Sequence, residues 1–412
     1  MTETTTTDTL ETDPFGTGLL GTPNLGTGAL EHRERVDFRR LREARLRRFL
    51  RAMDERGLDA CFFGREANAR YVTGVRRLWT AQSRPFVPAC LVVRGAPPVV
   101  ELLAFSASYE DIPAEVGPDH FYPVTWNPMN LIERFRAVPG LLDARRIGFD
   151  GLSPLFEGML RPAFPDAEFV GVEDTMRAIR RVKLPDEITC IRTAAAIAES
   201  SLYAAIAELR PGVTEQHLRA AFLDRMCELG TSQFAQQGTF SVLDPGAPLR
   251  WTTTDRELRD GDLVALAGGA LWAGYEGSLA RTWCCGISTS PSAAQRATYA
   301  RWRGVVDAVA DQCRPGRTGG DVRAAFERAG GGRPTMSIAY AVGLGHEGPI
   351  AGPGMSPELE RAQALEAGVV VAVRHFEADA AGGCFGEDLF LVTPGDPERL
   401  TTLGPGPLAA GD

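Results

Sequence analysis

Lysine is almost absent from this chain, since Lys183 is the single lysine among 44 basic residues. The 53 acidic residues outnumber the basic ones, giving a formal net charge of -9 and a sequence pI near 5.3. A negative protein repels phosphate backbones, so we expect no nucleic-acid partner. The arginine-rich segment 39–51 is therefore interpreted as the solvated face of a helix.

Long apolar runs and C-x-x-C motifs are also missing. No stretch approaches the roughly 18 apolar residues needed to cross a bilayer, and the N-terminus lacks the basic-then-apolar pattern of a signal peptide. We therefore expect a cytoplasmic protein with no membrane partner. The eight cysteines include no C-x-x-C pair, so we interpret them as reduced, mostly buried thiols.

Length and composition predict two globular domains. The chain has 412 residues, of which 44% are hydrophobic and 24% charged, and this suits two full-sized cores. Its first residues are rich in Thr, Gly and Pro, which predicts a flexible arm, and a role of this arm in embracing a second copy stays open. The expected organisation is an arm at 1–35, an α/β N-terminal domain at 36–170, a linker at 171–185, a second domain at 186–402 and a tail at 403–412.

The hydrophobic spacing predicts the elements of both domains. In the first, we expect a helix at 36–56 that stops at Gly57, strands at 60–63, 89–93 and 98–103, and a helix at 130–135. In the second, we expect helices at 185–209, 214–228, 292–312 and 320–329, and strands at 237–243, 262–266, 271–274, 369–374 and 387–392. Two helices followed by hairpins, twice over, predict a duplicated α+β unit around a curved antiparallel sheet.

Six short motifs, in this order, resemble those of the creatinase/prolidase (M24 peptidase, pita-bread) superfamily over residues 36–402. They are N-x-x-Y-x-T-G at 68–74, R-x-x-K-x-x-x-E-I at 180–188, P-G-x-T-E at 211–215, a G-D-L-V hairpin at 261–282, G-L-x-H-E-x-P at 343–349 and G-E-D at 386–388. The resemblance implies an N-terminal α/β creatinase-type domain, a C-terminal pita-bread domain whose curved sheet is flanked by helices, and a homodimer.

The resemblance also implies a place for metal ligands. Metallopeptidases of this superfamily hold two ions with two Asp, one His and two Glu, and the matching positions here are Ala267, Ser278, Tyr340, Arg374 and Glu387. Only Glu387 keeps a ligand of the family, and a guanidinium cannot coordinate a cation. We therefore expect no metal and no other cofactor. Arg374 and Glu387 are expected to form an ion pair.

A small carboxylate-bearing substrate is the partner that the remaining polar residues favour. Arg250 and Arg374 would hold its charge, with Tyr340 and Ser278 as further contacts. His346 or Glu387 would transfer the proton.

Three functions follow from these residues. The main interpretation is a metal-independent creatinase-like hydrolase or lyase that breaks a C-N bond in a small nitrogenous metabolite bearing a carboxylate. The first alternative is a metal-dependent Xaa-Pro aminopeptidase or dipeptidase, which would need the missing ligands. The second alternative is a catalytically silent ligand-binding or interaction protein. Polar and charged replacements at the family's ligand positions favour a site that is active or binds a ligand.

Overall fold

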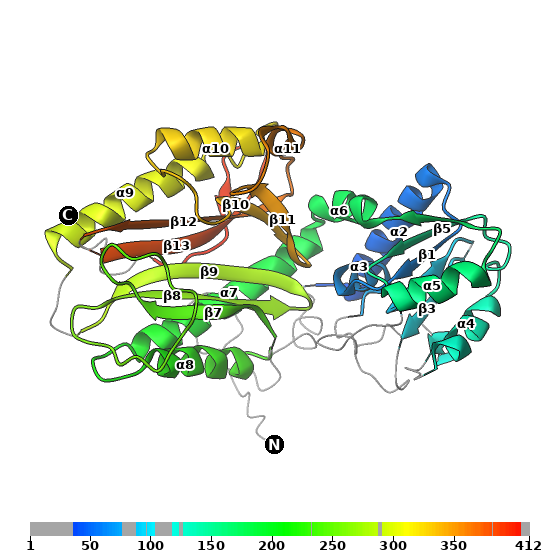
Figure 1. Cartoon of the computed structure of the whole chain (residues 1–412), viewed down its shortest axis with the longest axis horizontal. Coiled ribbons are helices and arrows are strands. Elements are labelled where there is room, and N and C mark those ends of the chain that lie inside the picture. Colours follow the sequence, from blue (N-terminus) through cyan, green and yellow to red (C-terminus); the bar gives the residue numbers. More distant parts are fainter. Residues whose placement is uncertain are drawn as a thin grey trace, which may run out of the picture. The chain divides into compact units, whose positions relative to one another are not determined.

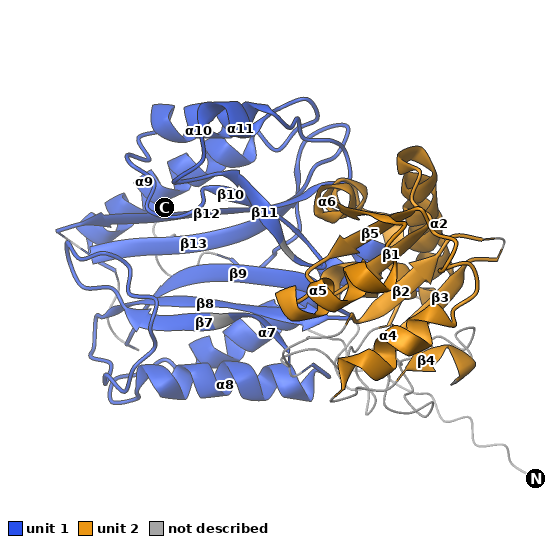
Figure 2. Ribbon diagram, turned by 45° about the vertical axis from the view of Figure 1, so that its right-hand side comes forward, with its two compact units in different colours: residues 1–36, 187–412 blue, residues 37–186 orange. Residues whose placement is uncertain are grey.

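The computed structural model describes residues 36–75, 88–95, 97–103, 118–122, 127–231, 233–286, 291–380 and 382–404 (Figure 1). The expected arm at 1–35 and most of the expected tail lie outside these ranges. The described chain forms two compact units, one of residues 37–186 and one that begins at Glu187 (Figure 2). None of the described helices is both long and apolar enough to cross a membrane.

The unit of residues 37–186 is built around a six-stranded sheet with the strand order β4-β3-β2-β1-β5-β6. The helix α2 begins after Asp37, whose side chain accepts a hydrogen bond from the Arg40 amide, and ends at Gly57 with a left-handed φ of 62°. Both ends agree with the predicted helix. The elements are α2 (Phe38–Arg56), β1 (Ala60–Phe63), α3 (Glu66–Thr73), β2 (Cys90–Val93), β3 (Val99–Leu103), η1 (Pro118–His120), β4 (Phe121–Tyr122), α4 (Pro128–Arg136), β5 (Arg146–Asp150), α5 (Pro154–Ala163), β6 (Glu168–Gly171) and α6 (Glu173–Arg181).

The motif at 68–74 lies on helix α3, and its Asn68 helps to attach this helix to the sheet. Asp150, at the end of β5, accepts hydrogen bonds from the amides of Gly64 and Arg65, at 2.7 and 3.0 Å, and from the side chain of Asn68. These bonds hold the start of α3 against the sheet. Burial raises the pKa of Asp150 to about 6.

The second unit contains a larger antiparallel sheet with the order β11-β10-β12-β13-β9-β8-β7, with β14 paired to β13. Helix α8 packs on β7, and α9 packs on β12 and β13 (Figure 1). This arrangement confirms the predicted curved antiparallel sheet flanked by helices. Its elements are α7 (Pro185–Ala207), α8 (Glu215–Glu228), β7 (Phe234–Val242), β8 (Leu263–Trp272), β9 (Tyr275–Cys284), α9 (Ala293–Ala310), α10 (Gly319–Arg328), β10 (Ala339–Gly343), β11 (Gly345–Ala351), α11 (Pro357–Arg361), β12 (Val370–Asp379), β13 (Gly382–Leu391) and β14 (Glu398–Arg399).

The hairpin of β8 and β9 fixes which side chains face the inside of this sheet. Its strands pair without a shift from Leu263 opposite Cys284 to Trp272 opposite Tyr275. Gly277 lies against α7, because a Cβ there would come within 2.0 Å of the Ala195 amide nitrogen. Successive side chains of a strand point to opposite faces. The even-numbered residues around Gly277 therefore face away from α7.

The tip of the hairpin differs from the prediction of a strand at 271–274. The strand ends at Trp272, and the turn consists of Ala273 and Gly274, which have φ values of 50° and 83°. A two-residue hairpin turn requires positive φ at such positions. Ala273 is the one described residue other than glycine with a positive φ. Because this conformation is unfavourable for a residue with a Cβ, the turn lowers the stability of the fold locally.

We expect Ala273→Gly to raise the free energy of unfolding by about 0.5–1 kcal/mol, because glycine adopts positive φ without the Cβ clash of alanine. Urea denaturation with an unchanged m value would measure it. The matched control is Ala324→Gly inside α10, where glycine should instead destabilise by about 0.5–1 kcal/mol. A loss of stability in Ala273→Gly would contradict this account of the turn.

Candidate functional site

The residues that the sequence analysis matched to metal-ligand positions come together on one face of the larger sheet. Ala267 pairs with Ala280, Ala280 pairs with Glu387, and Glu387 pairs with Arg374, so one row crosses β8, β9, β13 and β12. Residues directly opposite each other in antiparallel strands present their side chains to the same face. Tyr340 pairs with Ala372, two residues before Arg374, and thus shares this face.

Tyr340 is at the centre of a buried hydrogen-bond network. Its hydroxyl accepts a bond of 2.9 Å from the Gln236 amide and donates one of 3.1 Å to Glu387. The Ser278 hydroxyl lies 3.4 Å from the same oxygen. Tyr340, Ser278 and Glu387 are 0%, 1% and 3% exposed. Burial raises the pKa of Tyr340 well above its usual value, so its hydroxyl keeps its proton at neutral pH.

Arg374 lies over this network. Its guanidinium carbon is 4.9 Å from the centre of the Tyr340 ring and 5.9 Å from that of Trp251. Its Nη1 is 3.7 Å from the nearest carboxylate oxygen of Glu387, which is an ion pair longer than a hydrogen bond. Its Nε donates to the carbonyl of Ser337. The guanidinium is therefore held in place while its outer nitrogens keep donor capacity.

Burial opposes the charge on Glu387. It raises the pKa of this carboxyl above the usual value, although the guanidinium of Arg374 and hydrogen bonds from Ser278 and Tyr340 act in the opposite direction. Glu387 is the residue that the sequence analysis matched to a retained ligand of the family. Two neighbours favour the charged form of Glu387. The phenol of Tyr340 donates a hydrogen bond to the carboxylate, and the guanidinium of Arg374 supplies a positive charge.

Glu276 is a member of the site that the sequence analysis did not identify. It is 2% exposed, and the Ser278 hydroxyl lies 3.4 Å from its carboxylate. Burial and the nearby charge of Glu387 raise the pKa of Glu276 to about 8. The sequence could have indicated this residue, because side chains alternate between the two faces of strand β9 and residue 276 must therefore face the same side as residues 278 and 280.

Arg250 is not brought to this cluster. It forms an ion pair with Glu215, which is fully buried and also accepts bonds from the amides of Val242 and Thr254. The carbonyl of Arg250 accepts a bond of 2.9 Å from Ser241 on β7. These contacts fasten the loop that carries Trp251 to the sheet. Arg250 thus positions a neighbour, and the substrate contact expected from it has no geometric support here.

His346 begins the segment of the H-E-x-P motif on β11. Its backbone pairs with Val342 on β10, but its side chain lies outside the described part of the structure. The catalytic role expected for it therefore stays a prediction.

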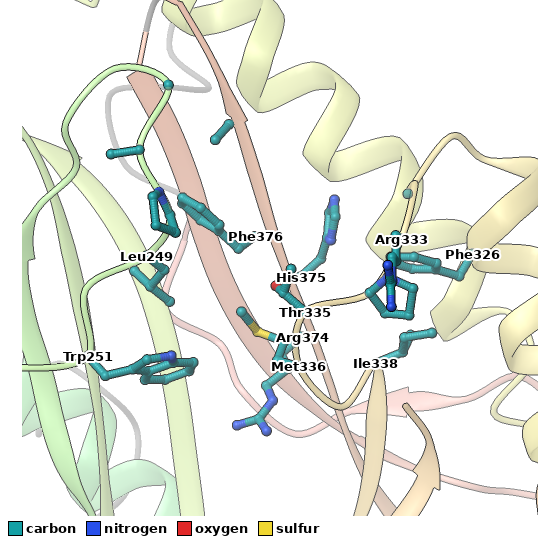
Figure 3. A pocket seen from close by; sticks show the side chains of 16 residues that line it. Leu249, Trp251, Phe326, Arg333, Thr335, Met336, Ile338, Arg374, His375 and Phe376 are labelled. Atoms are coloured by element: carbon teal, nitrogen blue, oxygen red, sulfur yellow. The ribbon is translucent and has the colours of Figure 1, made fainter. Parts of the chain in front are cut away.

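A cavity of about 510 Å³ opens beside Arg374 (Figure 3). Trp251, Leu249 and Phe376 line one side, and Ile338, Phe326 and Arg333 line the other. Met336 and His375 lie between them. Burial lowers the pKa of His375 despite its contact with Glu377, so its ring is neutral at pH 7. The cavity is mainly apolar, with arginine as its charged component.

Comparison with known proteins extends this description. Residues 189–394 match metallopeptidase family M24, and residues 45–182 match the creatinase/prolidase N-terminal domain. The chain is 24% identical over 368 residues to an Xaa-Pro dipeptidase of Pyrococcus furiosus, which covers 87% of this chain and 97% of that protein.

Solved structures agree with the fold. The prolidase of Pyrococcus horikoshii OT3 matches 88% of this chain and 99% of its own, with a TM-score of 0.69 and 21% identity. An X-Pro aminopeptidase of Thermotoga maritima covers 87% of this chain and 98% of its own, with a TM-score of 0.69 and 19% identity. These likenesses confirm the predicted two-domain fold with a pita-bread C-terminal half.

The comparisons correct the main functional interpretation. The relatives are named as Xaa-Pro dipeptidases and aminopeptidases, and the matching family is one of metallopeptidases. The expectation of a metal-independent creatinase-like enzyme for a small nitrogenous metabolite was therefore wrong, and the first alternative, an Xaa-Pro peptidase relationship, is better supported. The expectation of an enzyme of hydrolase type agrees with this peptidase family.

The carboxyl of Glu276 gives a pH-dependent prediction. It releases its proton near pH 4.5 when unfolded but near pH 8 when folded, so the wild type loses folding free energy as the pH rises between these values. Glu276→Gln does not titrate. We expect its stability relative to wild type to be greater at pH 8 than at pH 5, measured by chemical denaturation. Glu366→Gln, at an exposed position, is the control, and a pH-independent difference for Glu276→Gln would refute the assignment.

Proposed function

The chain belongs to metallopeptidase family M24, and from this premise we propose that it binds short peptides of the Xaa-Pro type in the cavity beside Arg374. The observation that carries the proposal is the position of this cavity. Arg374 both lines it and stands at one of the family's ligand positions, opposite Glu387. The peptide would thus lie next to the row of residues that replaces the metal centre.

The shape and chemistry of the cavity support a peptide of this size. A volume of about 510 Å³ falls within the roughly 300–1,000 Å³ typical of small-molecule sites. Trp251, Phe376 and Leu249 offer a flat apolar surface for a pyrrolidine ring. The guanidinium of Arg374 matches a carboxylate in geometry and charge.

The residues at the ligand positions do not fit a pair of divalent ions, and we include this in the proposal. Ala267 has no donor atom, and Tyr340 is a phenol that keeps its proton. Arg374 adds a permanent positive charge. Among the described residues, no group of three or more His, Cys, Asp or Glu side chains is placed to hold a metal ion.

The positive charge of Arg374 is the main factor that opposes the binding of a divalent metal ion at this site. At about 4 Å and an effective dielectric constant of about 20, two unit charges interact by roughly 4 kcal/mol, so a divalent ion would be repelled by roughly 8 kcal/mol. A charged Glu387 at a similar distance would at most cancel this repulsion, which leaves no net attraction to offset the cost of dehydrating the ion. We therefore assign no step of the chemistry to a metal.

The residues of the site have distinct tasks in this proposal. Arg374 binds the peptide carboxylate. The ring of Tyr340 and the carboxylate of Glu387 contact its guanidinium and hold it in position. Trp251 packs 5.6 Å from Phe385, with the rings nearly perpendicular, and closes one wall. Glu276 keeps a proton beside Ser278 at neutral pH.

We expect the dipeptide Ala-Pro to bind to the wild type and Arg374→Gln to weaken this binding by about 10–100-fold, the effect of losing a charged hydrogen bond. Isothermal titration calorimetry measures the affinity, and release of free proline in the same samples reports hydrolysis. Arg328→Gln, which removes an exposed arginine outside the cavity lining, should leave binding unchanged. The absence of Ala-Pro binding, or equal binding by Arg374→Gln, would refute the proposal.

Metal content provides a separate prediction. Elemental analysis of the purified protein, and calorimetric titration with Mn²⁺, should show no stoichiometric divalent ion, because Arg374 repels it. A saturable site with one or two ions per chain would show that the ligand assignment is wrong. Treatment with a chelator should likewise leave the melting temperature unchanged.

A further inference from the structure

The charges that line the cavity are all of one sign. Of the sixteen described residues that line it, Arg333 and Arg374 are cationic and none is Asp or Glu. The nearest carboxylates are already engaged. Glu387 contacts Tyr340 and Arg374, and Glu377 contacts His375 and Arg301.

The two arginines lie on different parts of the wall. Arg374 extends toward the side of Trp251, whereas Arg333 lies beside Phe326 (Figure 3). Arg333 is exposed, and no ion pair joins it to any carboxylate of the described residues. A carboxylate can therefore be bound by either arginine.

A free dipeptide meets a difficulty in such a cavity. It carries a carboxylate at one end and an ammonium at the other, and the described cavity lining offers two guanidinium groups but no carboxylate to receive the ammonium. An ammonium that leaves water without a counter-charge loses its hydration without compensation. A peptide with an acylated amino terminus has no such charge, and its acyl group suits the apolar wall.

We infer that this cavity selects N-acylated peptides with a free carboxylate over free dipeptides. The inference rests on the proposed function, since it specifies which Xaa-Pro peptides the same site takes. Arg333 is the residue that determines this specificity. It lines the cavity but lies outside the row of ligand positions on the sheet.

Calorimetric titration of the full-length protein with N-acetyl-Ala-Pro, Ala-Pro and N-acetyl-Ala-Pro amide tests the inference. We expect N-acetyl-Ala-Pro to bind at least tenfold more tightly than Ala-Pro, and the amide, which lacks the carboxylate, to lose at least tenfold. Arg333→Gln should reduce the preference for the acetylated peptide to less than threefold. Arg328→Gln, a neighbouring exposed arginine outside the lining, should keep the full preference.

The outcomes separate the two proposals. If Ala-Pro binds as tightly as N-acetyl-Ala-Pro or more tightly, the selectivity is refuted while peptide binding stands. An unchanged preference in Arg333→Gln would likewise refute the role of Arg333 alone. If none of the three peptides binds, the proposed function fails and the selectivity fails with it.

Discussion

The ion pair between Arg374 and Glu387 is the interaction around which the candidate site is arranged. The two residues are directly opposite each other in the β12–β13 ladder, so the backbone register, and not flexible side-chain placement, brings the charges together. Tyr340 contacts both, through its hydroxyl to Glu387 and its ring face to Arg374. Arg374 remains only 16% exposed at its side chain, and this remaining exposure connects the pair to the cavity.

The buried cluster holds one cation and two carboxyl groups. Arg374 contributes a permanent positive charge, whereas burial raises the pKa of both neighbouring carboxyl groups, that of Glu387 and that of Glu276, the latter to about 8. A second ionised carboxylate would have to share the same guanidinium at low dielectric, and burial disfavours this. The raised pKa of Glu276 therefore follows first from its own burial and then from the nearby charge of Glu387.

Elements set by local signals were predictable from the sequence. Asp37 and Gly57 fix the ends of α2, and the hydrophobic spacing placed β1 and the helices of the second unit with small shifts at their ends. The pairing of Arg374 with Glu387 was also expected. The contact of Arg250 with Glu215, 35 residues away in sequence, could not be predicted from the position of Arg250 in a motif. Glu276 was missed because it matches no ligand position, although its place on β9 determines its orientation.

Tyr340, Arg374 and Glu387 depend on one another. A carboxylate at position 374 would remove the one cation beside Glu276 and Glu387 and leave three carboxyl groups close together, so their pKa values would rise for lack of a counter-charge. An imidazole restored at position 340 alone would face the guanidinium of Arg374 and lose the phenol that donates to Glu387. A single substitution in this group thus disturbs its neighbours, because Tyr340 donates a hydrogen bond to Glu387 and Arg374 forms an ion pair with the same carboxylate.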